Sequence, residues 1–162
     1  MISGQESLPG KPIQLSERLK GRPLPHNVAM EQSVLGCAML RLEALSAMIS
    51  KLRFSDFYDP RHQLIFEAIE MLHIDQKPCD ILTVTNQLIL NEKIGSAGGR
   101  EYVSSLPGSV PFVANYASYI ELVRGLSLKR RLITALDGVI EHTFSSDLEA
   151  EQLIELADRK ST

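Results

Sequence analysis

The chain has 162 residues, of which 44% are hydrophobic, 23% charged and 6% aromatic, with no tryptophan. This is enough apolar material for one hydrophobic core, so the composition excludes a wholly disordered chain. The formal net charge of −3 argues against nucleic-acid binding over the whole surface, because such proteins carry an excess of Lys and Arg. No apolar run approaches the ~20 residues of a membrane-spanning helix, so we expect no membrane span.

Residues 1–25 are predicted to form a flexible leader, because they mix prolines and glycines with few apolar residues. The start of the chain lacks the apolar stretch of a secretory signal, so we expect a cytoplasmic protein. Two cysteines, Cys37 and Cys79, are too few for a disulfide scaffold and favour reduced, buried thiols.

Residues 26–110 are predicted to form a compact globular subdomain of about five short helices. Three helix starts are marked by capping residues, at Asn27, at Asp59 followed by Pro60, and at Asp80. Apolar residues at helical spacing predict helices from residue 28, over 42–52, from residue 60, over 81–91 and around 100–106. The glycine-rich stretch 95–99 separates the last two.

Residues 111–162 are predicted to form a helical hairpin, which makes the expected fold all-α. No proline interrupts residues 114–144, and Ser146 to Glu149 has the spacing of a capping box that starts a second helix. The apolar face of the first helix is wider than a small neighbouring unit could cover, so we interpret the hairpin as an oligomerisation element. The candidate interface residues are Val123, Leu126, Ile133, Leu136, Ile140, Phe144, Leu153 and Ile154.

Searches for enzymatic motifs find no catalytic, cofactor-binding or metal-binding residues. No P-loop is present, because neither Lys11 nor Lys160 stands in the required glycine context. The histidines are scattered without ligand spacing, and His62 is expected to be exposed or half-buried. The glycines at 95–99 are interpreted as a plain turn rather than a phosphate cradle. The basic run Lys129 to Arg131 is interpreted as a solvated helix flank, with a contact to a partner subunit or to nucleic acid as the alternative.

A series of short motifs resembles the N-terminal domain of bacterial DnaB-type replicative DNA helicases over about residues 24–160. The series begins with Pro25-His26-Asn27-Val28-Ala29-Met30-Glu31-Gln32-Ser33-Val34-Leu35-Gly36, although Ala29 and Met30 stand where the family has Glu-Ala. It continues through Asp56-Phe57-Tyr58, His62, Ile65-Phe66, Pro78-x-Asp80-Ile81-Leu82-Thr83, Gly98-Gly99-x-x-Tyr102, Pro111-x-x-Ala114-Asn115-x-x-x-Tyr119, Val123-Arg124, residues 128–133 and residues 153–160.

The resemblance implies that the chain is the collar domain of a hexameric, ATP-driven helicase, serving subunit assembly and the docking of primase and of a helicase loader. ATP and Mg²⁺ would bind to a RecA-like motor domain that this chain lacks, so we expect no ATP hydrolysis and at most weak DNA binding by these residues. The alternative is a stand-alone helical adaptor, such as a helicase loader that borrows the fold. The natural open reading frame distinguishes the two alternatives. A P-loop encoded downstream would support the helicase, whereas a stop codon near Thr162 would support the adaptor.

Overall fold

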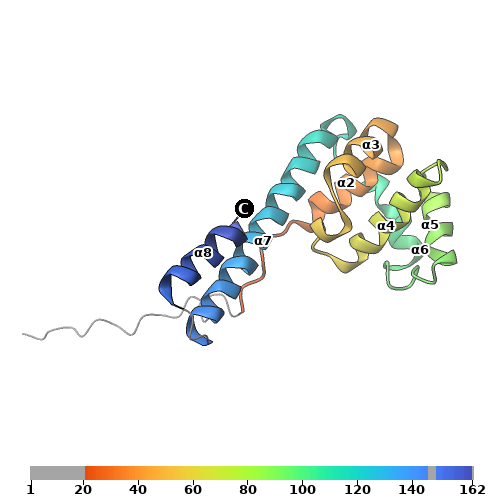
Figure 1. Cartoon of the computed structure of the whole chain (residues 1–162). Helices are drawn as coiled ribbons and strands as arrows, with labels where there is room; N and C mark the ends of the chain where they lie inside the picture. Colours follow the sequence, from red (N-terminus) through yellow and green to blue (C-terminus); the bar gives the residue numbers. More distant parts are fainter. Residues whose placement is uncertain (1–20, 146–148, 162) are drawn as a thin grey trace, which may run out of the picture. The chain divides into compact units, whose positions relative to one another are not determined.

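A computed structural model describes residues 21–145 and 149–161 of the chain (Figure 1). These residues form seven α-helices and no strand, which confirms the predicted all-α fold. The predicted leader up to residue 20 and the predicted cap at Ser146 lie outside the described residues. No helix in the described part of the chain combines the length and the apolar character of a membrane-spanning segment.

The first compact unit, called the globular unit below, comprises Pro25–Arg130. The described structure confirms the predicted capping residues. The Asn27 side chain accepts a hydrogen bond from the Met30 amide, Asp59 from that of Arg61, and Asp80 from those of Leu82 and Thr83. The helices they begin or precede are α2 (Val28–Leu40), α3 (Leu42–Lys51), α4 (Pro60–Ile74), α5 (Ile81–Leu90) and α6 (Gly99–Ser105).

The core of the globular unit lies between α2, α4 and the helices packed on them. α2 contacts α3, α4 and the short turn η2 (Pro107–Ser109), while α4 contacts α5, which in turn contacts α6 (Figure 1). A Cβ added to Gly36 would lie 2.4 Å from the backbone oxygen of Leu106, so only glycine lets α2 approach η2 this closely. The largest buried apolar side chains are Phe57, Phe66, Leu35, Met48, Ile65, Ile69, Leu88, Leu106 and Ile120.

The long helix α7 (Tyr116–Ser145) follows two short turns, η2 and η3 (Val113–Asn115). Its first part belongs to the globular unit, because Tyr119, Ile120 and Val123 are buried in the core. The globular unit therefore ends at Arg130, twenty residues beyond the 110 at which the sequence suggests a boundary. Helical periodicity could not place this division, because it falls inside a continuous helix.

The remaining part of α7, from Arg131, and α8 (Ala150–Ser161) form the predicted hairpin. Figure 1 shows α8 alongside the C-terminal end of α7. A Cβ added to Gly138 would lie 3.4 Å from the Lys160 Nζ atom, so the small residue stands where the two helices approach each other. Below, "hairpin" means residues 131–161 as described.

Candidate interaction surface

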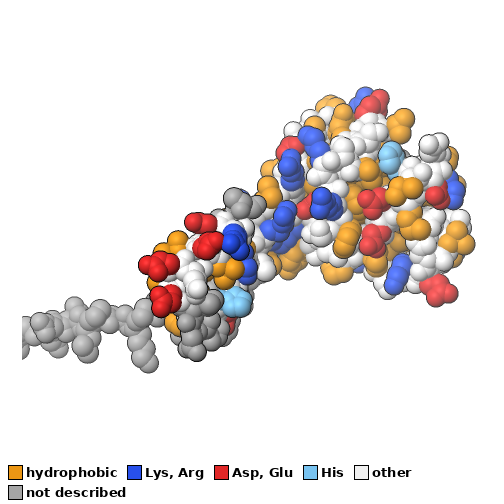
Figure 2. All heavy atoms as spheres, in the orientation of Figure 1, with side chains coloured by type: hydrophobic (Ala, Val, Ile, Leu, Met, Phe, Trp, Pro, Cys, Tyr) orange, Lys and Arg blue, Asp and Glu red, His pale blue; other side chains and the backbone are white. Residues whose placement is uncertain are grey.

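The hairpin has no buried side chain among its described residues, in contrast to the globular unit. Several of its large apolar side chains are strongly exposed, up to 72% for Phe144 and 63% for Ile154. Figure 2 shows hydrophobic side chains among carboxylates on this part of the molecule. Exposed apolar side chains at this density are typical of a surface that another protein covers.

The predicted interface residues divide into three groups by exposure. Leu136, Phe144 and Ile154 are exposed, and Leu126, Ile133, Ile140 and Leu153 are half-buried. Val123 is only 1% exposed and lies in the core of the globular unit. The assignment of Val123 to an intersubunit surface is therefore corrected, because the chain itself covers this side chain.

Exposed and half-buried apolar residues of the hairpin form one ridge along α7. Leu132, Leu136, Ile140 and Phe144 succeed each other at i, i+4 steps, which places neighbours side by side on a helix surface. On α8, Leu153, Ile154 and Ala157 stand at i, i+1 and i+4. Such ridges are the ordinary elements of helix–helix packing between subunits.

The three side chains of the basic run Lys129 to Arg131 differ in their exposure to solvent. Lys129 and Arg131 are exposed, as predicted for a solvated flank, but Arg130 is buried. Its guanidinium donates hydrogen bonds to the backbone oxygens of Pro25, at 2.9 Å, and Asp56, at 2.5 Å. The solvated interpretation is therefore wrong for Arg130, which instead ties α7 to the segments before α2 and before Phe57.

His62 is fully buried, which corrects the prediction of an exposed or half-buried side chain. Its Nδ1 atom lies 2.6 Å from a carboxylate oxygen of Glu31, and its Nε2 atom lies 2.6 Å from the hydroxyl of Tyr102. The Glu31 carboxylate also accepts hydrogen bonds from the backbone amides of Tyr58 and Asp59. This network joins α2, α4 and α6, so it serves the packing of the globular unit.

The glycine-rich turn is explained by the same network. Gly98 and Gly99 have positive φ angles, and a Cβ on Gly98 would lie 2.7 Å from the ring of Tyr102. Glycine is needed here for the backbone conformation and for the close approach of the tyrosine.

In residues 21–145 and 149–161, no group of three or more His, Cys, Asp or Glu side chains is placed to hold a metal ion.

Both cysteines are free. Cys37 is buried, as predicted, and Cys79 is half-buried. Burial raises the pKa of the Cys37 thiol to about 11, and burial together with the charge of Asp80 raises the pKa of Cys79 to about 12. Both side chains are therefore thiols rather than nucleophilic thiolates near neutral pH.

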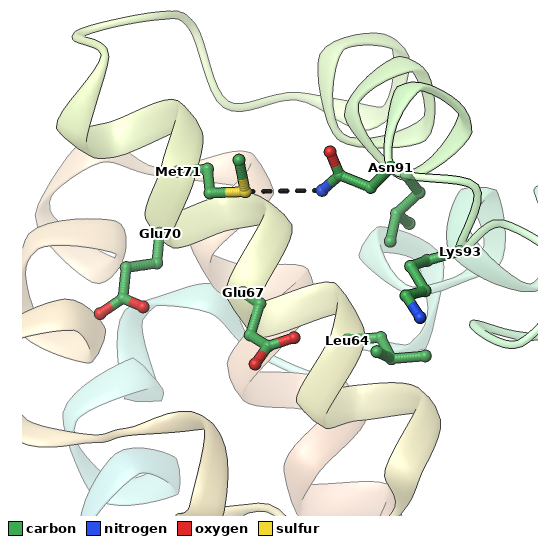
Figure 3. A pocket seen from close by; sticks show the side chains of 7 residues that line it. Leu64, Glu67, Glu70, Met71, Asn91 and Lys93 are labelled. Atoms are coloured by element: carbon green, nitrogen blue, oxygen red, sulfur yellow. Dashed lines mark hydrogen bonds between the residues drawn. The ribbon is translucent and has the colours of Figure 1, made fainter.

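A groove lies between α4 and α5 in the globular unit (Figure 3). It has a volume of about 520 Å³ and is lined by Leu64, Glu67, Glu70, Met71, Leu88, Asn91 and Lys93. This groove could not be predicted from the sequence, because its lining residues come from two different helices and the turn after α5.

The comparisons with a family profile and with individual protein sequences indicate the same protein family. The sequence profile of the DnaB-like helicase N-terminal domain matches residues 23–125. The chain is 33% identical over 141 residues to the replicative DNA helicase DnaB of Leifsonia xyli subsp. xyli, covering 87% of the chain and 31% of that protein. It is 34% identical over 154 residues to DnaB of Treponema pallidum, covering 94% of the chain and 35% of that protein. The chain thus spans about a third of the length of these relatives.

A solved structure agrees with this comparison. The fold is similar to the crystal structure of the N-terminal domain of DnaB helicase from Mycobacterium tuberculosis, with a TM-score of 0.79 and 30% identity. The match covers 86% of this chain and 98% of that one.

Proposed function

Because the chain belongs to the family of DnaB-like helicase N-terminal domains, we propose that it is the collar domain of a hexameric replicative DNA helicase. In this role it assembles subunits through the hairpin and provides a docking surface for primase and for a helicase loader. The whole protein unwinds duplex DNA in the cytoplasm, with ATP and Mg²⁺ bound by a separate motor domain.

The exposed apolar ridge of the hairpin carries the assembly part of this proposal. Leu132, Leu136 and Phe144 are exposed on α7, and Ile154 is exposed on α8. Since no described side chain of the hairpin is buried, the two helices leave apolar surface for a second copy to cover. Pairing of two hairpins is expected to bury about 1,000 Å² or more, as in specific protein interfaces.

We assign ATP binding to the separate motor domain, because the 162 residues contain no P-loop sequence. The Tyr102 ring packs against Gly98 of the glycine-rich turn, and this turn precedes a helix of only seven residues. Acidic side chains outnumber basic ones in residues 26–162, which disfavours phosphate contacts. Any DNA affinity of these residues should therefore be weak and lost as salt is raised.

Sedimentation of the chain at tens of micromolar tests the assembly role. We expect a dimer or larger species, and we expect Leu136→Asp combined with Phe144→Asp to give a monomer, because two charges would be buried in the interface. Leu82→Asp is the control, since Leu82 is also apolar and is 80% exposed but lies on α5 in the globular unit. Monomeric wild-type chain, or equal association of all variants, would contradict the proposal.

A pull-down of the cognate primase by residues 1–162 tests the docking role. The C-terminal helical region of primase should be retained by the wild-type chain. The parent helicase lacking the hairpin should retain it less well, because the composite docking surface depends on paired hairpins. Undiminished primase binding by that deletion would refute this role of the hairpin.

A further inference from the structure

The groove between α4 and α5 belongs to the globular unit, and no hairpin residue lines it. Its floor is apolar and consists of Leu64 and Met71 from α4 and Leu88 from α5. Met71 is exposed, and two more exposed apolar side chains, Ile74 and Leu90, lie at the C-terminal ends of the same two helices. Figure 2 shows acidic side chains among hydrophobic ones over α4.

The walls of the groove carry opposite charges. Glu67 and Glu70 lie on α4, and Figure 3 shows Asn91 and Lys93 across from Met71 and Leu64, with Glu70 on the outer side of α4. Neither carboxylate makes a hydrogen bond or an ion pair with a described residue, although both are half-buried. Asn91 is engaged, since its amide donates to the Met71 sulfur at 3.4 Å. The two carboxylates are therefore available to pair with a cationic ligand.

The apolar and acidic positions of α4 form one stripe along the helix. Leu64, Glu67, Met71 and Ile74 succeed each other at i, i+3, i+7 and i+10, which keeps them on one face. At 1.5 Å per residue this stripe is about 15 Å long. A helix of about three turns laid along it would reach from one end to the other.

We propose that this groove is a docking site for a basic amphipathic helix of a partner protein. Apolar side chains at i, i+3 and i+7 of the partner pack on Leu64 and Met71, above the buried Leu88, and Lys or Arg side chains on one flank pair with Glu67 and Glu70. The other flank is neutral or acidic, because Lys93 would repel a second row of cations. Nucleic acid is disfavoured by the two carboxylates.

A synthetic peptide of about twelve residues tests the proposal, with leucines at the three anchor positions and lysines along one flank. The control peptide has glutamates in place of the lysines. Binding is measured by fluorescence anisotropy, and the site is mapped from amide chemical shifts of the labelled 162-residue chain. We expect the basic peptide to bind and to shift the amides of Leu64, Met71 and Leu88, while the acidic peptide binds at least about tenfold more weakly.

Two double variants of the chain separate charge pairing from a general change of net charge. Glu67→Lys with Glu70→Lys should lower affinity for the basic peptide about tenfold or more and favour the acidic peptide instead. Glu43→Lys with Glu101→Lys makes the same change of charge at exposed positions outside the groove, and it should leave the affinity unchanged. Retained native amide shifts in both variants show that the fold is intact.

Three results would overturn the proposal. Equal binding of the two peptides, or equal loss in both double variants, would show that the groove does not select a basic helix. Shifts of the groove amides on dilution alone would identify a second copy as the occupant. Competition by a peptide of residues 1–20 together with tighter binding after their deletion would identify the chain's own leader. Because none of these readouts involves the hairpin, their failure leaves the assembly proposal standing.

Discussion

The globular unit and the hairpin both consist of helices with apolar residues at helical spacing. Many apolar side chains of the globular unit are buried, whereas those of the described hairpin are exposed or half-buried. All buried hydrophobic residues of the described structure lie between Val34 and Val123, whereas the described hairpin has none. Even α7 follows this division, since Val123 is in the core and Leu136 is exposed. The helix α7 thus contributes buried residues to the core of its own chain and exposed apolar residues to a candidate interface with a second copy.

The polar contacts differ in the same way. In the globular unit, a buried carboxylate, a buried imidazole and a buried guanidinium make hydrogen bonds between helices far apart in sequence. In the described hairpin, the ion pair between Arg159 and Glu155 is local and exposed. The globular unit is therefore expected to lose stability sharply when single polar residues are removed, and the hairpin is not.

The largest expected effect is that of Glu31→Ala. It would leave the His62 imidazole and the amides of Tyr58 and Asp59 without their buried acceptor. We expect a loss of about 3–5 kcal/mol in the free energy of unfolding, measured with urea. Glu155→Ala in the exposed hairpin pair is the control and should cost less than about 1 kcal/mol. Similar losses in both variants would remove the contrast between the two regions.

Arg130→Ala is expected to cost about 1.5–3 kcal/mol, because hydrogen bonds to the Pro25 and Asp56 oxygens are lost. Its sequence neighbours are exposed, so Lys129→Ala and Arg131→Ala should change the stability by less than about 0.5 kcal/mol. Thermal unfolding of the three variants measures the difference. Equal effects would mean that the run acts as one solvated flank after all.

Two glycine substitutions are expected to act in opposite directions. Gly36→Ala should destabilise the globular unit by about 1–3 kcal/mol, since its Cβ would meet the Leu106 oxygen at 2.4 Å. Gly125→Ala lies in α7 with nothing within 4 Å of the added Cβ, so it should stabilise by up to about 1 kcal/mol. Urea unfolding of both variants should give midpoints on opposite sides of the wild type.

The smallest expected effect concerns pH. The hydrogen bond and ion pair with Arg61 hold the pKa of Asp59 below its ordinary value of 3.8. This contribution to stability is present above that value and is lost as the pH falls through the lowered pKa. Asp59→Asn keeps an acceptor at the helix start, so it should cost less than about 1 kcal/mol at neutral pH. Below about pH 4, the free energy of unfolding should decrease less for Asp59→Asn than for the wild type. Acid unfolding of the two proteins measures this difference.

The sequence predicted the features that depend on neighbouring residues. Asn27, Asp59 and Asp80 were identified as caps because a cap and the backbone amide that donates to it lie within three residues. The sequence did not predict that the side chains of His62, Arg130 and Val123 are buried. The residues that cover them lie far away in the sequence. Helical periodicity identifies an apolar face but not whether the chain itself or another copy covers it.

A usable signal for the buried network was nevertheless present. Glu31, His62 and Tyr102 all stand in the motifs that carry the family resemblance, and in the structure they are joined by hydrogen bonds. Grouping the polar residues of those motifs would have suggested a shared contact. The acidic groove between α4 and α5 had no such signal.

Amide hydrogen exchange at two protein concentrations, about a hundredfold apart, tests the central claim most directly. Protection of the globular unit should not change, because its core is complete within one chain. Protection of residues 131–161 should rise with concentration, because association stabilises a surface in proportion to the available partner. Equal protection of the hairpin at both concentrations would contradict the account, since the hairpin would then be stable without a partner.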